Sequence, residues 1–146
     1  MAITVVGYPL GWMTCWTTGI DMDAATWKIM LVTATYTPNL DTHDFYDDIT
    51  NELSTANGYT AGGATLASPA VTYDSATDQV RFDFTDASWT FTSAVTWRYA
   101  PVRIDTAGAN STDPLMVLVD WGTSQTVSGV YTIQLDPAGL FAVDFT

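Results

Sequence analysis

The sequence predicts an all-β fold, a single β-sandwich or jelly-roll-like domain of about eight or nine strands with one short helix. Thr, Val and aromatic residues are abundant and aromatics make up 13% of the chain, a composition that favours strands. Several segments alternate between apolar and polar residues with the period of a half-buried strand. Turn-forming residues recur about every eight to twelve positions, which is typical of sandwiches and barrels.

Length, charge and cysteine content exclude several classes of protein. The 146 residues, 47% of them hydrophobic, are enough for one domain with its own core. A formal net charge of −12 argues against direct binding of nucleic acid, because phosphates are bound by Lys and Arg. It argues equally against an anionic membrane surface. Cys15 has no partner for a disulfide, and we find neither a signal peptide nor a membrane-spanning run.

The first 26 residues are expected to form an N-terminal arm or accessory strands, ahead of a β-sandwich-like domain over residues 27–146. An apolar run from Ala2 to Val6 predicts a strand. The aromatic-rich segment Tyr8 to Ile20 has two interpretations. It could be a pair of strands that completes the core, or an arm that packs on another chain, because exposed aromatics and Met mark interfaces. The candidate interface residues are Tyr8, Leu10, Trp12, Met13 and Trp16.

The domain is organised around a stretch that begins as a strand from Trp27 to Ala34. Both sides of this strand are mostly apolar, so we expect it to be buried on both faces. Pro38 interrupts the run because it lacks an N–H and disfavours helical geometry before it. Asp41 or Thr42 can then cap a short helix over His43 to Ile49.

The remaining elements follow a loop of Gly, Asn, Ser and Thr over residues 54–63. Pro69 is expected to lie at an edge or a bulge. Asp136 to Gly139 fits a type I turn, with Pro in its second position. The expected strands are residues 64–73, 79–84, 88–91, 94–104, 115–121, 129–135 and 141–145.

The densest group of possible metal ligands is Asp41, His43, Asp44, Asp47 and Asp48. Carboxylates bind calcium, but this spacing matches no EF-hand loop, and acidic residues are common near helix N-termini. His43 lacks any motif that would supply a nucleophile and an orienting acid. Cys15 has no basic sequence neighbours to lower its pKa and is predicted to be a buried structural thiol. We therefore predict no catalytic residue, no metal and no cofactor.

A family resemblance covers most of the chain, from Trp27 to Phe145. It is carried by the strings KIMLVTATYTPNLDTHDFYDDITNEL, GYTAGGATL, VTYDSATDQVRFD, SWTFTSAVTWRYAPV, PLMVLVDWG and YTIQLDPAGLF. These resemble a family of small structural proteins of tailed bacteriophages, similar to head decoration (cement) proteins or head fibres. The most specific part is TYTPNLDTHDFYDDITNE followed by GYTAGG, which contains no catalytic signature.

The resemblance implies a non-enzymatic virion protein that binds the outer surface of the capsid and stabilises the head. Its partners would be the major capsid protein and further copies of itself, as a homotrimer. It would be synthesised in the host cytoplasm and reside on the virion. The alternative is a fibre- or tail-associated adhesin that binds host-surface glycans through aromatic residues. At least three of the six Trp residues, however, occupy alternating strand positions and are predicted to lie in the core.

Overall fold

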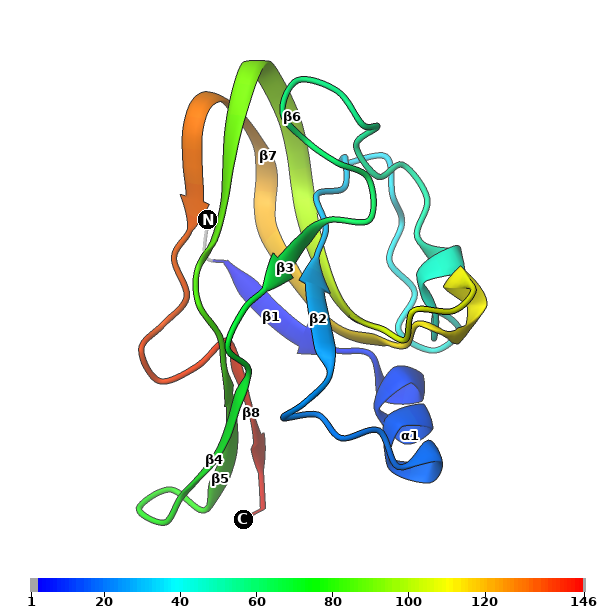
Figure 1. Ribbon diagram of the computed structural model, residues 1–146, viewed down its shortest axis with the longest axis vertical. Helices are drawn as coiled ribbons and strands as arrows, with labels where there is room; N and C mark the ends of the chain where they lie inside the picture. Colours follow the sequence, from blue (N-terminus) through cyan, green and yellow to red (C-terminus); the bar gives the residue numbers. More distant parts are fainter. Residues whose placement is uncertain (1–2, 146) are drawn as a thin grey trace.

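The computed structural model describes residues 3–145, which form eight β-strands, one α-helix and two short 3-10 helices (Figure 1). Met1, Ala2 and Thr146, which belong to the expected ranges 1–26 and 27–146, lie outside the described residues. In chain order the elements are β1 (Thr4–Gly7), α1 (Pro9–Thr18), β2 (Thr26–Ile29), η1 (Tyr46–Asp48), β3 (Ala64–Leu66), β4 (Ala70–Asp74), β5 (Gln79–Asp83), β6 (Ala87–Asp105), η2 (Asn110–Thr112), β7 (Leu115–Ile133) and β8 (Phe141–Asp144).

The strands form two antiparallel sheets, and the all-β, sandwich-like fold class is confirmed. The larger sheet has the order β1-β7-β6-β2-β3, and the smaller sheet has the order β4-β5-β8. Pro69 falls in the break between β3 and β4, next to Ser68 with its positive φ of 52°. The strand expected over Ala2 to Val6 appears as β1, in the part that the structure describes.

The long hairpin β6–β7 wraps around the main core. Each strand has 19 residues and joins two of the shorter strands that the sequence pattern predicted. Their pairing shifts register between Phe91 and Val95 and again between Trp97 and Tyr99. Such bulges bend a strand and increase its twist. As a result, the pair folds over at the top of the molecule and runs down again on the other side (Figure 1).

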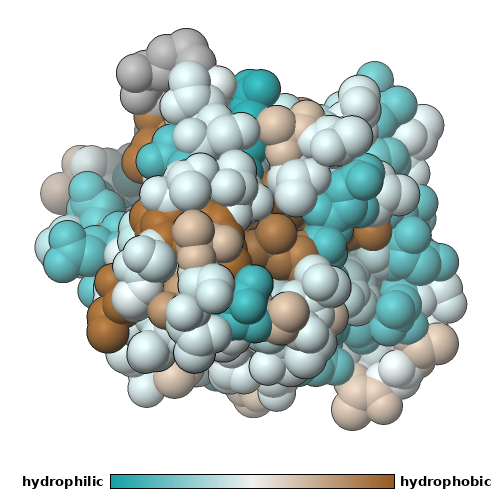
Figure 2. All heavy atoms as spheres, turned by 90° about the horizontal axis from the view of Figure 1, so that it is seen from above, coloured by the Kyte–Doolittle hydropathy of each residue, from teal (hydrophilic) through white to brown (hydrophobic). Residues whose placement is uncertain are grey.

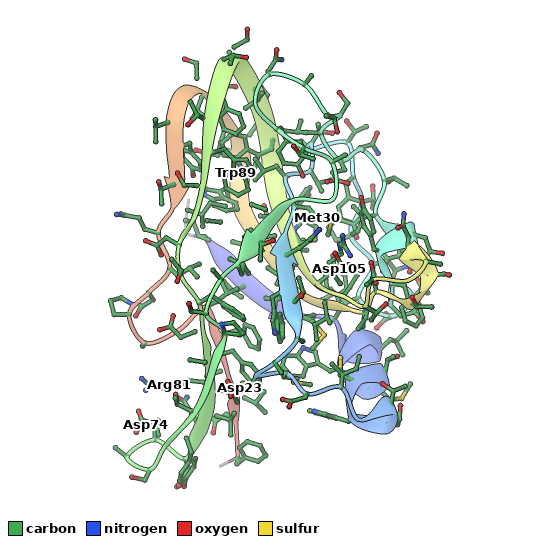
Figure 3. All side chains as sticks on the ribbon, viewed as in Figure 1. Asp23, Met30, Asp74, Arg81, Trp89 and Asp105 are labelled. Atoms are coloured by element: carbon green, nitrogen blue, oxygen red, sulfur yellow. The ribbon has the colours of Figure 1, made fainter. Side chains whose placement is uncertain are left out.

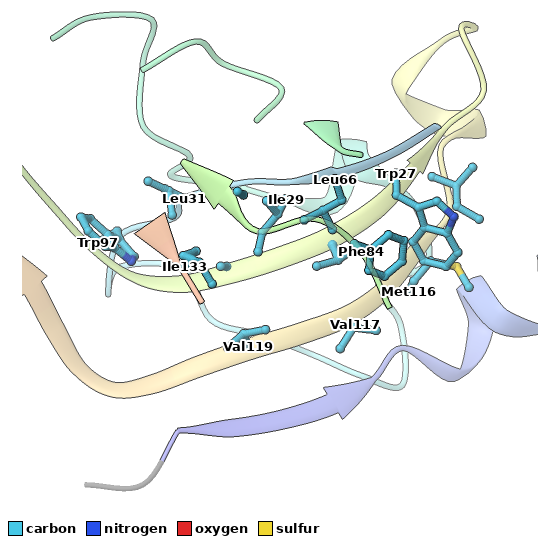
Figure 4. Close-up of a cluster of buried hydrophobic side chains, with 14 of the residues drawn as sticks. Trp27, Ile29, Leu31, Leu66, Phe84, Trp97, Met116, Val117, Val119 and Ile133 are labelled. Carbon is cyan, nitrogen blue, oxygen red and sulfur yellow. The ribbon is translucent and has the colours of Figure 1, made fainter. Parts of the chain in front are cut away.

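The strand that starts at Trp27 is buried on both faces because each face meets a different hydrophobic core. Trp27, Ile29 and Leu31 point into the main core, where they meet side chains of β7 such as Val117 and Val119 (Figure 4). The intervening Met30 and Val32 belong to a second, smaller core. The regular strand ends at Ile29, but the backbone follows β6 further. The Met30 N–H donates to the Pro101 carbonyl at 2.9 Å, and the Val32 N–H donates to the Tyr99 carbonyl at 2.9 Å.

The helix expected over His43 to Ile49 is wrong, because only the single 3-10 turn η1 forms there. The Asp48 carboxylate accepts the backbone N–H groups of Asp44, at 2.9 Å, and Phe45. Such local side-chain bonds compete with helix formation. Neighbouring segments take further backbone groups: the Tyr46 N–H donates to the Asp113 carbonyl, and the Leu115 N–H donates to the Asp44 carbonyl. The backbone N–H and C=O groups of this segment therefore form other hydrogen bonds instead of those of a helix.

The strand pair considered for Tyr8 to Ile20 is also wrong, because most of this segment is helix α1. Pro9 occupies the first turn, where its missing N–H costs nothing. Gly19 ends the helix in the left-handed conformation at φ 72°, and its N–H donates to the Cys15 carbonyl. Trp12 and Cys15 project from one face into the main core, which also contains Trp27. Residues on both sides of position 26 thus share one core.

Helix α1 lies directly against β7 at Gly11. A Cβ atom on this residue would lie 1.7 Å from the Leu115 carbonyl oxygen, far inside van der Waals contact. Gly elsewhere in a helix is less stable than Ala by about 1 kcal/mol. Here only a residue without a side chain permits the close approach. At this position Gly must therefore give a more stable fold than Ala.

We predict that Gly11→Ala lowers the free energy of unfolding by about 1–3 kcal/mol, because the added methyl forces the helix away from β7. Urea unfolding followed by circular dichroism measures the change. Thr17→Ala, on the exposed side of the same helix, is the matched control and should change stability by less than about 0.5 kcal/mol. If Gly11→Ala were instead stabilising, as it is in an isolated helix, the close approach to Leu115 would not exist in solution.

Candidate functional site

The main candidate site is an open, apolar groove between β1 and β8, closed at one side by helix α1. Its volume is about 490 Å³. None of the residues that line it is charged. They are Val5, Val6 and Gly7 of β1, Pro9, Trp12 and Trp16 of α1, Val117 of β7, and Phe141, Ala142 and Val143 of β8.

Trp12 forms the floor of this groove and is held rigidly. Only 8% of Trp12 is exposed, and its indole Nε1–H donates to the Met116 carbonyl at 2.8 Å. Its ring packs edge-on against Phe82 and Phe141, each with a centroid separation of 5.3 Å. Such pairs stabilise by about 0.5–1.5 kcal/mol beyond the area they bury. The groove floor is therefore part of the core and is already formed without a ligand.

Trp16 forms the rim one helical turn later. Residues four apart lie on the same face of a helix, and the Trp16 ring lies 5.9 Å from the ring of Trp12. Trp16 nevertheless remains 66% exposed. It is the one exposed Trp among residues 3–145, since Trp12, Trp27, Trp89 and Trp97 are buried and Trp121 is half-buried. The prediction that at least three Trp side chains lie in the core is confirmed.

The five candidate interface residues separate into two groups. Tyr8 is fully buried and offers no free surface, whereas Trp12 is mostly buried and reaches the surface only at the floor of the groove. Met13 and Trp16 are exposed, and Leu10 is half-buried. Sequence reasoning missed the other groove walls, which come from β1 and from β8 near the end of the chain. The available signal was the uncharged, wholly apolar character of both edge strands near their centres.

Several large hydrophobic residues are exposed at the surface outside the groove as well. Figure 2 shows hydrophobic atoms gathered near the middle of the upper face, among neutral and hydrophilic ones. Scattered exposure of this kind is normal for a soluble domain, and only a contiguous patch indicates an interface. The large exposed hydrophobic side chains that do not line the groove are Ile3, Met13, Tyr73, Val130 and Phe145.

The predicted acidic cluster around His43 does not come together as a ligand set. Among residues 3–145 no group of three or more His, Cys, Asp or Glu side chains could hold a metal ion. Burial opposes ionisation of Asp48, but the N–H donors of Asp44 and Phe45 outweigh it and lower its pKa. His43 accepts or donates through Nδ1 to the Tyr36 hydroxyl at 2.7 Å, and Tyr36 contacts the Tyr8 hydroxyl at 3.1 Å. These bonds hold the segment against the second core.

A polar cluster around Glu52 was not predicted from the sequence. Its carboxylate accepts the hydroxyl groups of Tyr46 and Tyr59, each at 2.6 Å, and the Gly62 N–H at 2.7 Å. The Arg103 guanidinium lies 4.3 Å from the centre of the Tyr46 ring. The cluster ties the long irregular segment between β2 and β3 to the large sheet, so we assign it a structural role.

Cys15 lies in the main core with 1% exposure, which confirms the predicted buried thiol. Burial raises its pKa to about 11, so the thiolate that reacts with oxidants and metals is scarce near neutral pH. Its Sγ lies 3.4 Å from the Met116 sulfur. Cys15 thus helps to dock α1 on β7.

Comparison with known proteins adds no relative. No protein-family model, curated protein or solved structure matches this chain. The resemblance to phage virion proteins therefore stays a prediction. Within residues 3–145, no helix has the length and apolar character needed to cross a membrane.

We predict that Trp16→Ala changes the free energy of unfolding by less than about 0.5 kcal/mol, because the side chain is exposed. Trp12→Ala, one turn away, should lower it by about 3–5 kcal/mol, because it removes a buried ring and the hydrogen bond that its indole N–H donates to the Met116 carbonyl. Urea unfolding compares the two variants. Equal losses would mean that Trp16 belongs to the core and that the groove is closed.

We predict that stability falls as the pH rises from about 10 toward 12. Burial, followed by the hydrogen bond to Glu52, raises the pKa of Tyr46 to about 12, whereas an unfolded Tyr ionises near 10. The folded state keeps a proton that the unfolded state releases in this range, so unfolding is increasingly favoured. Tyr46→Phe should flatten this part of the stability–pH curve, measured by urea unfolding. An unchanged slope would show that Tyr46 does not ionise differently in the two states.

Proposed function

We propose that this chain is a non-enzymatic structural protein of a tailed-bacteriophage virion, which binds the outer surface of the capsid and stabilises the head as a decoration (cement) protein. The observation that carries the proposal is the uncharged groove with the exposed Trp16 at its rim. It is a preformed apolar docking surface on a strongly acidic chain. The sequence resemblance suggests what the surface docks on, namely the major capsid protein.

The surface and the net charge of this chain suit the role of a decoration protein. A specific protein–protein interface buries about 800 Å² on each partner, and its central contacts are enriched in Trp and Tyr. The net charge of −12 makes free copies repel one another weakly and keeps them soluble. Many copies on one shell add avidity, so each single contact can remain modest. Binding of this kind requires no catalytic residue and no cofactor.

The proposal includes a homotrimer on the capsid surface. The outer face of the β6–β7 hairpin carries exposed Thr and Ser side chains that pair across the strands. Thr96 and Thr126 hydroxyls lie 2.8 Å apart, and the Thr132 hydroxyl donates to Ser88 at 3.1 Å. A polar, uncharged face of this kind can pack against neighbouring copies without bringing like charges together. The chain would be made in the host cytoplasm and assembled onto the virion.

A fibre- or tail-associated adhesin is the second candidate, and the same Trp16 favours it. An exposed indole ring offers a flat apolar face on which a sugar ring of a host glycan can stack. In this role the groove beside Trp16 would hold the rest of the glycan. The two candidates differ in the partner that Trp16 recognises, so one variant can separate them.

We predict that the purified chain cosediments with capsids assembled without it, and that Trp16→Ala weakens this binding by about tenfold or more. Tyr73→Ala is the matched control, because Tyr73 is a similarly exposed aromatic on the smaller sheet. No cosedimentation by the wild-type chain would overturn the decoration role. Glycan-array binding that is lost in Trp16→Ala, without capsid binding, would support the adhesin instead.

A further inference from the structure

Strand β1 has a free edge beside the groove. Among residues 3–145 it pairs only with β7, and all four of its residues are exposed. The Tyr8 N–H donates to the Met116 carbonyl at 3.0 Å, so every second residue back from Tyr8 faces β7. In an antiparallel ladder the intervening residues point their backbone groups the other way. The N–H and C=O groups of Val5 and Gly7 are therefore directed to the outer edge.

Within residues 3–145 this edge carries no charged residue or Pro and no other strand covers it, so the short length of β1 is the one usual protection against strand pairing that it keeps. Natural edge strands carry Lys or Pro, bear inward charges, or are covered by another segment. β1 reads TVVG, and Val5 and Val6 are 41% and 39% exposed. An apolar, uncovered edge next to an apolar groove is suited to accept one more strand.

The opposite wall of the groove is a second strand edge. In the part of the chain that the structure describes, β8 pairs only with β5, and the Phe145 N–H donates to the Asp78 carbonyl at 3.2 Å. The same alternation then directs the backbone groups of Ala142 away from β5. The groove thus lies between the edges of the two sheets, with Trp12 and Val117 below it.

The charge pattern decides which kind of strand fits. Each of the four Lys and Arg residues of the chain forms an ion pair with an Asp: Lys28 with Asp105, Arg81 with Asp74, Arg98 with Asp120 and Arg103 with Asp113. Figure 3 shows Arg81 and Asp74 beside one another on the β4–β5 hairpin. No unpaired Lys or Arg is therefore left to attract an acidic partner. In this groove a second copy, also at −12, is disfavoured relative to a basic partner, and contacts between copies are left to the polar, uncharged face of the β6–β7 hairpin.

We infer that the groove binds an extended segment of a partner protein, which adds as a strand to the free edge of β1. The segment has apolar residues in alternation, facing Trp12 and Val117, and Lys or Arg on its flanks. Backbone hydrogen bonds to Val5 and Gly7 provide affinity, the apolar floor selects the side chains, and the acidic surface selects basic flanks. Trp16 covers one end of the inserted strand.

This inference deepens the proposed function, because it names the kind of capsid segment that docks. It rests on the proposed function only for the identity of the partner. The binding mode itself follows from the strand edges, the uncharged groove and the paired cations, and it can be tested without a capsid.

The test uses the full chain and a synthetic peptide, KKVTVTVKK, blocked at both ends, with binding measured by calorimetry and by Trp fluorescence. We expect saturable one-to-one binding. The acidic peptide EEVTVTVEE should bind about tenfold more weakly or worse, because its flanks meet an acidic surface. A version of the basic peptide with N-methyl groups on alternate amides, which cannot donate to a strand edge, should lose binding to a similar degree.

Val5→Lys in the protein should also abolish binding, because it places a charge at the groove edge. Val130→Lys is the matched control: it makes the same change at a residue that is 74% exposed and does not line the groove, and it should bind like the wild type. Equal binding by both variants, by both charge forms of the peptide or by the N-methylated peptide would overturn the inference. A wild-type dimer that Val5→Lys dissociates in sedimentation would also overturn it, since a second copy would then be the occupant.

Capsid binding separates this inference from the proposed function. If the wild-type chain and Val5→Lys bind capsids equally, the decoration role stands and the strand-addition mode falls. If the peptide results are as expected but the chain does not bind capsids, the mode stands and the decoration role falls.

Discussion

The central constraint in this fold is that the segment from Trp27 to Val32 is shared between two hydrophobic cores. Alternate side chains of a strand point to opposite faces, so Trp27, Ile29 and Leu31 fill the main core while Met30 and Val32 fill the smaller one. The β6–β7 hairpin, bent where its register shifts, curls around the main core. The smaller core fastens the irregular segment with Tyr36 and η1 to the back of the same sheet. A slip of the strand by one residue would turn each set of side chains to the opposite face and disrupt the packing of both cores.

The groove is a consequence of how α1 docks on this framework. Gly11 lets the helix approach the β7 backbone, which brings Trp12 to the Met116 carbonyl and to Phe141 of the smaller sheet. Trp16 lies one turn beyond that anchor, where the core has ended, so it is left exposed on the same helix face. The apolar floor is already ordered as part of the folded core, so it loses little conformational entropy when a partner binds.

Local patterns in the sequence correctly indicated the fold class and most of the strands. Alternation and turn residues depend only on near neighbours, which is why segments such as Gln79–Asp83 and Phe141–Asp144 were found. The burial of Cys15 and of at least three Trp side chains also followed from residue chemistry and alternating strand positions. Helix α1 was missed although Pro9 and Gly19 bracket it, because its aromatic and Thr-rich composition favours strands. The helix expected at His43 to Ile49 failed where tertiary backbone bonds outweighed local propensity.

The candidate site itself was decided by the tertiary structure. Its walls come from Val5 near the beginning of the chain and Ala142 near the end, and no local pattern records that these two edges face one groove. The sequence singled out Trp12 and Trp16 together as interface residues, but the helix places one in the floor and the other on the rim. The amino-acid composition determines which residues favour burial and how acidic the surface is. Which apolar residues remain exposed depends on which side chains find space in the close-packed cores, and only the tertiary structure determines that.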